Sequence, residues 1–234
     1  MTMDPLVLLT DVDRATDELL RSAADLDPAA VGSPSRLPGW TVGHVLTHVA
    51  RNADALTNLL TTARTGVETP PYPSPEARET GIQDGAARPL RDQLEDIRAS
   101  HERFADAAAA MPAEAWAVFL PWLGQSAAAL PWTRLREVTV HHVDLGLGYT
   151  PAEWSDAFSL RLLREIVAGA TDDWPALQLR PYGIEHVLTI GSAPSPPVVG
   201  GPTRSIAAWL AGRHDGTDLT VSPDGELPTP ARWK

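Results

Sequence analysis

The sequence contains no cysteine and only one lysine, Lys234. The absence of cysteine excludes disulfides, thiolate metal sites and a sulfur nucleophile from the chain itself, so any thiol chemistry needs an external thiol. With lysine only at the last position, a Schiff-base mechanism has no suitable residue. The other 18 basic residues are arginines, whose planar guanidinium groups suit the binding of small carboxylates.

Positive charge and long apolar runs are also scarce. The 30 acidic residues outnumber the 19 basic ones, and the net charge of -11 disfavours nucleic acid or an anionic membrane surface as a partner. No apolar run approaches the roughly 18 residues that span a bilayer, and the first 20 residues lack the basic start and apolar middle of a signal peptide. We therefore expect a cytoplasmic protein that binds small molecules. The oligomeric state is left open, and a monomer is compatible with the sequence.

Helical periodicity dominates the first 150 residues. Apolar residues recur at helical spacing over about 5–26, 41–66, 90–111 and 133–147, with Thr41 placed to cap the second helix and Gly66 to end it. Four helices in this length predict a bundle. The stretch 66–89 contains five prolines, too many for a regular element, so we expect a long loop there, of a kind that is often functional.

The pattern changes after residue 150. Helices are expected at 155–170 and 203–211, and short apolar runs at 177–180, 186–190 and 219–221 predict strands. The sequence therefore predicts an α+β protein, with a four-helix bundle over 1–150 and a small α+β domain over 151–234. The helix at 155–170 could alternatively pack onto the bundle.

Glu137 and His141 are four residues apart in the fourth helix, so both side chains project from one face and could share a divalent metal ion. Taken alone, they are weak evidence for a metal site, because a hydrogen-bonded surface pair has the same spacing. In the second helix His48 borders the buried stripe while His44 faces outward, which makes His48 the better third ligand, although it could instead bond a carbonyl. Three protein ligands leave a position open, as catalytic zinc sites do. Asp144 could orient the His141 imidazole or be solvated near the helix end.

The remaining histidines are weaker candidates. His101 and His142 lie on apolar stripes, where a core histidine with a satisfied hydrogen bond is the commoner situation. His186 and His214 lie in the second domain without an obvious partner, and we expect them to be exposed.

Several segments together resemble a known family. They are residues 38–41 (PGWT) leading into 44–52 (HVLTHVARN), the loop 72–78 (YPSPEAR), residues 136–146 (REVTVHHVDLG), 209–213 (WLAGR) and 228–233 (PTPARW). Over nearly the whole chain they resemble the mycothiol-dependent maleylpyruvate isomerases of actinobacteria. The segment around His48 alone is shared by a broader superfamily of thiol-dependent metalloenzymes with DinB-like four-helix bundles, so the other segments carry the narrower resemblance.

The resemblance implies a DinB-like bundle that holds zinc through His48, Glu137 and His141, and an α+β domain that closes over the site. It also implies that Arg213, at the end of the last helix, is important for activity. The alternative for Arg213 is an arginine facing the helix dipole. The implied reaction converts maleylpyruvate to fumarylpyruvate in the gentisate route of aromatic degradation, with mycothiol as cofactor.

Such a reaction has a clear physical requirement. Rotation about a C=C bond needs that bond to become single for a time, and reversible addition of the mycothiol thiolate would do this, with zinc lowering the thiol pKa. The substrate carries two carboxylates, so a guanidinium should bind it, with Arg213 as first choice and Arg78 as second. Asn52 and the loop at 72–78 are candidates for contacts with the thiol.

Two other functions are compatible with the residues. A mycothiol S-transferase of the same superfamily would attach the thiol to an electrophile and consume it. A non-catalytic protein would bind a small apolar ligand in its second domain and use the metal for structure. A structural zinc site normally has four protein ligands, whereas only three emerge here, which favours catalysis.

Overall fold

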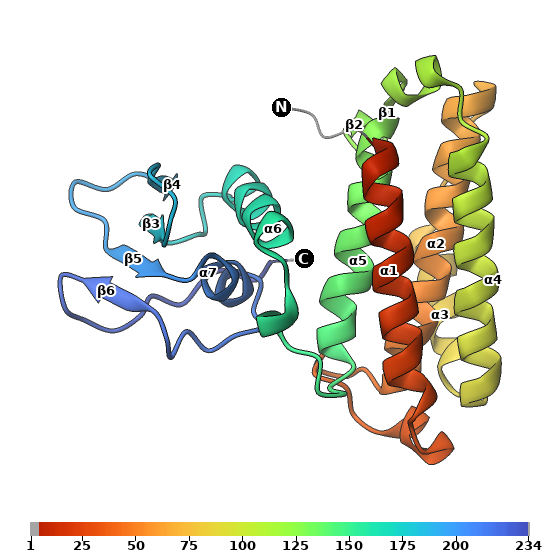
Figure 1. Ribbon diagram of the computed structural model, residues 1–234, viewed down its shortest axis with the longest axis horizontal. Coiled ribbons are helices and arrows are strands. Elements are labelled where there is room, and N and C mark those ends of the chain that lie inside the picture. Colours follow the sequence, from red (N-terminus) through yellow and green to blue (C-terminus); the bar gives the residue numbers. More distant parts are fainter. Residues whose placement is uncertain (1–4, 234) are drawn as a thin grey trace. The chain divides into compact units, whose positions relative to one another are not determined.

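The computed structural model describes residues 5–233, and the chain divides into two compact units, Met1–Gly148 and Tyr149–Lys234. The first unit is mainly helical and the second combines helices with a sheet (Figure 1), which confirms the α+β prediction. None of the described helices is long and apolar enough to cross a membrane.

The first unit is built on four long helices and one shorter one: α1 (Pro5–Ala24), α2 (Val42–Thr65), α3 (Pro75–Ala86), α4 (Leu90–Ala109) and α5 (Leu130–Asp144). Both α1 and α2 pack against α4 and α5, so the four long helices close into a bundle (Figure 1). Thr41 and Gly66 bound α2 as expected. The helix α5 begins earlier than the periodicity indicates because Pro131 lies in its first turn, where the fixed φ of proline suits a helix.

Helix α3 corrects the prediction of a long loop over 66–89. Pro75 occupies the first turn of α3, where a missing N–H costs no hydrogen bond, and the Ser74 side chain accepts a hydrogen bond from the amide of Ala77. Between Pro75 and Pro89 the sequence has no proline. The number of prolines was therefore misleading, because their positions flank the helix rather than interrupt it.

Short elements connect the bundle helices. They are the 3₁₀ helices Pro28–Gly32, Ala113–Ala117 and Ala127–Ala129, and an antiparallel hairpin of β1 (Phe119–Leu120) and β2 (Gln125–Ser126). The hairpin exposes the rings of Phe119 and Trp122.

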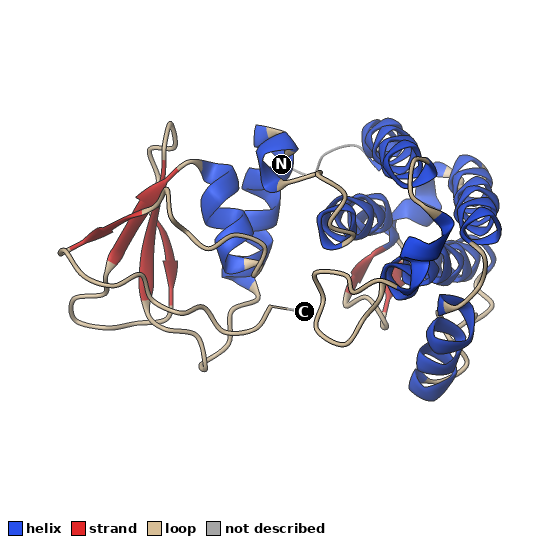
Figure 2. Ribbon diagram, turned by 90° about the horizontal axis from the view of Figure 1, so that it is seen from below, coloured by secondary structure: helices blue, strands red, loops and turns tan. Residues whose placement is uncertain are grey.

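The second unit is a four-stranded sheet with two helices. After a 3₁₀ turn at Pro151–Glu153 come α6 (Asp156–Ala168), β3 (Leu177–Pro181), β4 (Leu188–Ile190), β5 (Val198–Gly201), α7 (Thr203–Leu210) and β6 (Thr220–Ser222). The strand order is β4-β3-β5-β6, with β3 and β5 parallel and the other pairs antiparallel. Figure 2 shows α6 and α7 on one face of the sheet, and α6 packs on α7 and β4. The sequence prediction missed β5, which follows a proline-rich segment and ends in two glycines.

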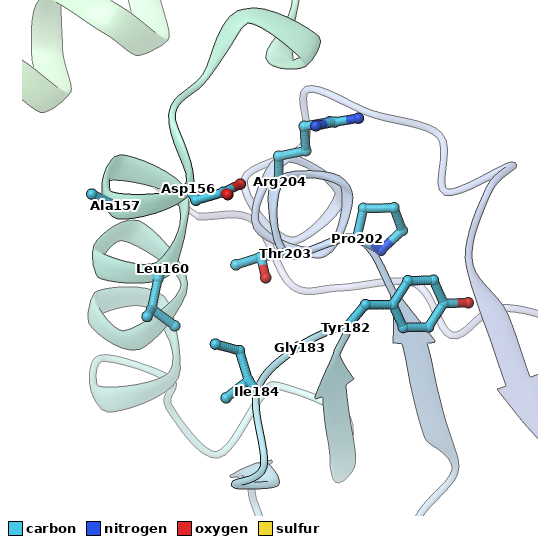
Figure 3. Close-up of a pocket in the computed structure, with 9 residues that line it drawn as sticks. All are labelled: Asp156, Ala157, Leu160, Tyr182, Gly183, Ile184, Pro202, Thr203 and Arg204. Carbon is cyan, nitrogen blue, oxygen red and sulfur yellow. The ribbon is translucent and has the colours of Figure 1, made fainter.

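The second unit also has a cavity of about 450 Å³ (Figure 3). It lies between the first turns of α6 and α7 and the turn after β3, with Asp156, Tyr182 and Arg204 among its lining residues. All three side chains are exposed, so the cavity is open to solvent.

Candidate metal centre

Helix α2 supplies the first residue of the site. The Thr41 side chain accepts a hydrogen bond from the amide of His44, and Nδ1 of His44 accepts one from the amide of Thr41, so the two residues cap the helix reciprocally. This cap fixes where the helix begins. His48 follows one turn after His44, and only 5% of it is exposed.

Helix α5 supplies the other two donors. Nε2 of His48 donates to Oε2 of Glu137 at 3.1 Å, and Nε2 of His141 lies 3.5 Å from the same oxygen. One candidate ligand atom from each of the three residues lies within 4.8 Å of the other two. This is the one such group of histidine and acidic side chains in the described part of the chain. The residues singled out by helical spacing are thus brought together in space.

Asp144 lies behind the His141 ring. Nδ1 of His141 donates to Oδ2 of Asp144 at 2.8 Å, and Asp144 is buried. With its Nδ1 proton held by Asp144, the neutral ring would present the Nε2 lone pair to a metal ion, an arrangement typical of ligating histidines. Of the two roles weighed for Asp144, its position matches the orientation of His141 and not a solvated helix end.

The three donor residues shift one another's pKa values. Burial and then the charge of His141 lower the pKa of His48 to about 4. Burial raises the pKa of the Glu137 carboxyl, but hydrogen bonds from His141 and His48 outweigh it and hold the pKa well below its ordinary value. Burial lowers the pKa of His141, but hydrogen bonds to Asp144 and Glu137 outweigh it and the pKa is raised. At neutral pH His48 is therefore neutral and Glu137 ionised, the forms that bind metals.

Arg78 and Trp40 border the site. Nη2 of Arg78, on α3, donates to Nδ1 of His48 at 3.4 Å, and its guanidinium carbon lies 5.9 Å from the centre of the Tyr72 ring. The Trp40 ring lies edge-on to His48 with 5.6 Å between ring centres. Arg78 reaches the site because it lies on α3. The sequence predicted a loop at this place, so a helix that was not predicted carries one of the candidate site residues.

Asn52 lies one turn after His48, and its Oδ1 accepts a hydrogen bond from Nη1 of Arg134 at 2.9 Å. Arg134 was not among the candidate residues that the sequence pattern indicates. It is fully buried, on α5, three residues before Glu137. That spacing places it on the same helix face as Glu137, which was the available signal.

Arg213 belongs to the second unit and follows shortly after α7, which ends at Leu210. Its Nη1 donates to the carbonyl of Ala211 at 2.6 Å, at the carboxyl end of that helix. This contact matches the alternative considered for Arg213, in which an arginine interacts with a helix end.

The other histidines lie outside the triad. His142 is buried, and Nε2 of His101 lies 3.1 Å from Oδ1 of Asp13. His186 is exposed, as expected. His214 is half-buried, and its Nδ1 accepts a hydrogen bond from the amide of Gly216, so the expectation of simple exposure is wrong.

Comparisons with known proteins show the family of the chain. The model of the mycothiol maleylpyruvate isomerase N-terminal domain matches residues 12–146. Two crystal structures of the mycothiol-dependent maleylpyruvate isomerase, one of them a histidine-to-alanine mutant, are each similar at 32% identity with a TM-score of 0.90, over 99% of this chain and 98% of theirs. No match was found among curated proteins. The chain belongs to the mycothiol maleylpyruvate isomerase family.

Proposed function

We propose that the chain is a mycothiol-dependent isomerase that converts maleylpyruvate to fumarylpyruvate at a zinc centre formed by His48, Glu137 and His141. The observation that carries the proposal is the convergence of these three donors, with His141 oriented by buried Asp144, in a chain 32% identical over 99% of its length to the mycothiol-dependent maleylpyruvate isomerase. A cytoplasmic location and small-molecule partners remain part of the proposal.

The donor set fits zinc. Two imidazole nitrogens and a carboxylate oxygen are ligands that zinc prefers, and three protein ligands leave a position for a further ligand. The lowered pKa values of His48 and Glu137 keep these two residues in the forms that bind metals, whereas a metal ion would compete with the proton that Asp144 and Glu137 favour on His141. When bound, zinc and mycothiol supply an activated thiolate, whose reversible addition makes the double bond of the substrate single. The chain has no cysteine that could take this role.

Arg78 is well placed to respond to metal binding. In the structure it donates to Nδ1 of His48, which is then the unprotonated nitrogen. An imidazole that ligates through Nε2 carries its proton on Nδ1 and cannot accept that bond. If His48 held the metal through Nε2, the Arg78 guanidinium beside the centre would lose this acceptor and would be available to bind a carboxylate of the substrate.

Asn52 and Arg213 complete the proposed set. Since Oδ1 of Asn52 is bound by Arg134, a contact with the thiol would come from Nδ2 of Asn52. Arg213 would bind the second carboxylate and help to stabilise the enolate that forms as the thiolate adds.

The test is to follow the ultraviolet absorbance of maleylpyruvate with purified zinc-loaded protein, with and without mycothiol, and to measure free thiol before and after. We expect fumarylpyruvate to form only with mycothiol and the thiol concentration to stay unchanged. His48→Ala should lose metal retention and isomerisation together.

Other outcomes would contradict the proposal. Loss of thiol without fumarylpyruvate would identify a mycothiol S-transferase. No change in substrate or thiol would show that the substrate is wrong, and full activity of a metal-free His48→Ala variant would show that the centre is not needed.

A further inference from the structure

We infer that Arg134 is a positioning residue for the candidate metal centre, holding the turn of α2 that carries His48 against α5. The inference deepens the proposed function and rests on its metal site. Nη1 of Arg134 donates to the carbonyl of Val49 at 2.7 Å and to Oδ1 of Asn52 at 2.9 Å. Val49 directly follows His48, and Asn52 lies one helical turn after it. One guanidinium therefore binds α2 at the turn that presents the histidine donor.

The spacing along α5 places Arg134 beside the two metal donors of that helix. Arg134 lies three residues before Glu137 and seven before His141, so all three side chains share one face of the helix. The three metal donors come from two helices, and their separation depends on how those helices pack. The Arg134 hydrogen bonds join the two helices beside the donors.

The burial of Arg134 argues against a role in fold stability alone. The side chain is 0% exposed, yet its Nε and Nη2 have no hydrogen-bond partner among residues 5–233. A buried cation with unpaired donors gives up hydration without full compensation. Well-packed apolar residues often replace whole buried ion pairs without loss of stability, so the burial of a charge is weak evidence for a stabilising role. The feature that an apolar side chain could not replace is the pair of directional bonds to α2.

The chemistry of the side chain also matters. A guanidinium is planar, and Nη1 carries two hydrogens at fixed angles, so one nitrogen can hold a main-chain carbonyl and a side-chain amide oxygen together. Burial lowers the pKa of Arg134 to about 10, so the group keeps both hydrogens at neutral pH. A lysine would keep the charge but lose the fixed angles.

The experiment compares Arg134→Met and Arg134→Lys with a matched control, Arg103→Met. Arg103 also connects two helices, because its Nε and Nη2 donate to Oδ1 of Asp54 at 3.0 and 2.6 Å, but it joins α4 to α2 at an exposed surface. Co²⁺ is titrated into the full-length, metal-free proteins in the absence of mycothiol and maleylpyruvate. The visible spectrum reports affinity and coordination geometry together, and thermal unfolding of the metal-free proteins reports stability.

We expect both Arg134 variants to bind Co²⁺ about 10-fold or more weakly, the loss typical when a group that orients a ligand is removed, with altered band intensities. The unfolding temperature of metal-free Arg134→Met should stay near that of the wild type. Arg103→Met should bind Co²⁺ as the wild type does.

Wild-type affinity and spectrum in both Arg134 variants would overturn the inference. Tighter binding by Arg134→Met would also overturn it, since the arginine would then act only by charge repulsion. If Arg134→Met does not fold, the Co²⁺ titration of Arg134→Lys, which keeps the buried charge, tests the inference. Failure of the wild-type protein to bind Co²⁺ would remove the proposed metal centre and this inference with it, whereas binding without isomerase activity would leave the inference standing.

Discussion

At the scale of single residues, Asp144 is the group on which the orientation of His141 depends. Its buried carboxylate receives the Nδ1 hydrogen of His141 at 2.8 Å. We expect Asp144→Ala to weaken zinc binding by roughly 10- to 100-fold, because the ring loses the partner that fixes its tautomer and its plane. Asp144→Asn should lose less, since an amide oxygen can still accept the hydrogen bond. Zinc titration at fixed pH measures both variants.

The pair of His101 and Asp13 supplies a control with the same chemistry. Nε2 of His101 lies 3.1 Å from Oδ1 of Asp13, and neither residue belongs to the triad. Asp13→Ala should therefore bind zinc as the wild type does. Equal zinc affinity in Asp144→Ala and Asp13→Ala would show that Asp144 does not orient the ligand.

The lowered pKa of His48 predicts that the stability of the metal-free protein depends on pH. Burial and then the charge of His141 lower its pKa from 6.5 to about 4, so between these pH values the unfolded chain holds a proton that the folded chain lacks. Stability should therefore fall as pH falls through this window, by on the order of 3 kcal/mol from this residue. The lowered pKa of Glu137 acts in the same direction at the acidic end. His141 has a raised pKa, so its contribution is complete below pH 6.5 and is lost as pH rises.

Urea unfolding of metal-free wild-type protein and of His48→Gln across this pH range measures the effect. Glutamine does not titrate, so the loss of stability on acidification should be clearly smaller in the variant. The same pH dependence in both proteins would show that other groups are responsible.

At the scale of elements, the close packing of α3 on α2 depends on glycine. A Cβ on Gly85 would lie 2.4 Å from Cγ2 of Thr47, the neighbour of His48 in sequence. We expect Gly85→Ala to destabilise the protein by about 1–3 kcal/mol, because Thr47 is buried and would have to shift to make room for the added Cβ. Gly81, on the same helix, has nothing within 4 Å of an added Cβ. Gly81→Ala should thus be neutral or stabilising by up to about 1 kcal/mol.

Urea unfolding of the two alanine variants checks this prediction. Because α3 carries Arg78, Gly85→Ala should also disturb the contact between Arg78 and His48. Equal stability changes at positions 85 and 81 would mean that the contact with Thr47 relaxes freely.

Some of the helices and strands could be predicted from the sequence, and others could not. The long amphipathic helices were predictable because burial imposes a period that a single sequence displays. Helix α3 was not, because one of its faces rests on α2 through glycine and leaves little apolar pattern to detect. The strand β5 has only two apolar side chains before its glycines, so its pairing with β3 and β6 defines it more than its own sequence does.

Some features of the candidate site could likewise be predicted from the sequence, and others could not. Spacing within α5 and the stripe on α2 predicted which donors face one another, and the structure places their donor atoms within 4.8 Å. Metal binding itself stays a prediction. The spacing of Arg134 from Glu137 could be read from the sequence but its burial could not, because an arginine in a helix is usually solvated and only the packing of α2 on α5 shows that this one is buried.

At the scale of the whole molecule, the candidate residues are distributed over two units. The metal donors, Asp144 and Arg78 all lie in the first unit, and Arg213 lies in the second. We expect Arg213→Ala to lower kcat/KM for maleylpyruvate by roughly 100- to 1,000-fold, the effect of losing one group that stabilises a developing charge. Zinc affinity should stay unchanged, because no donor has been touched. Arg204→Ala, at an exposed arginine of α7, should keep near-wild-type activity.

Because Arg213 donates to the Ala211 carbonyl, a further variant is needed to separate a role at the helix end from a role in binding substrate. If Arg213 only stabilises a helix end, a lysine at this position should preserve its favourable interaction with the helix dipole. If it binds a carboxylate through its planar fork, a lysine should preserve stability but not activity. We therefore expect Arg213→Lys to unfold at the wild-type temperature while kcat/KM remains far below the wild-type value. Recovery of both properties in the lysine variant would assign Arg213 to the helix end, and the second carboxylate of the substrate would then need another partner.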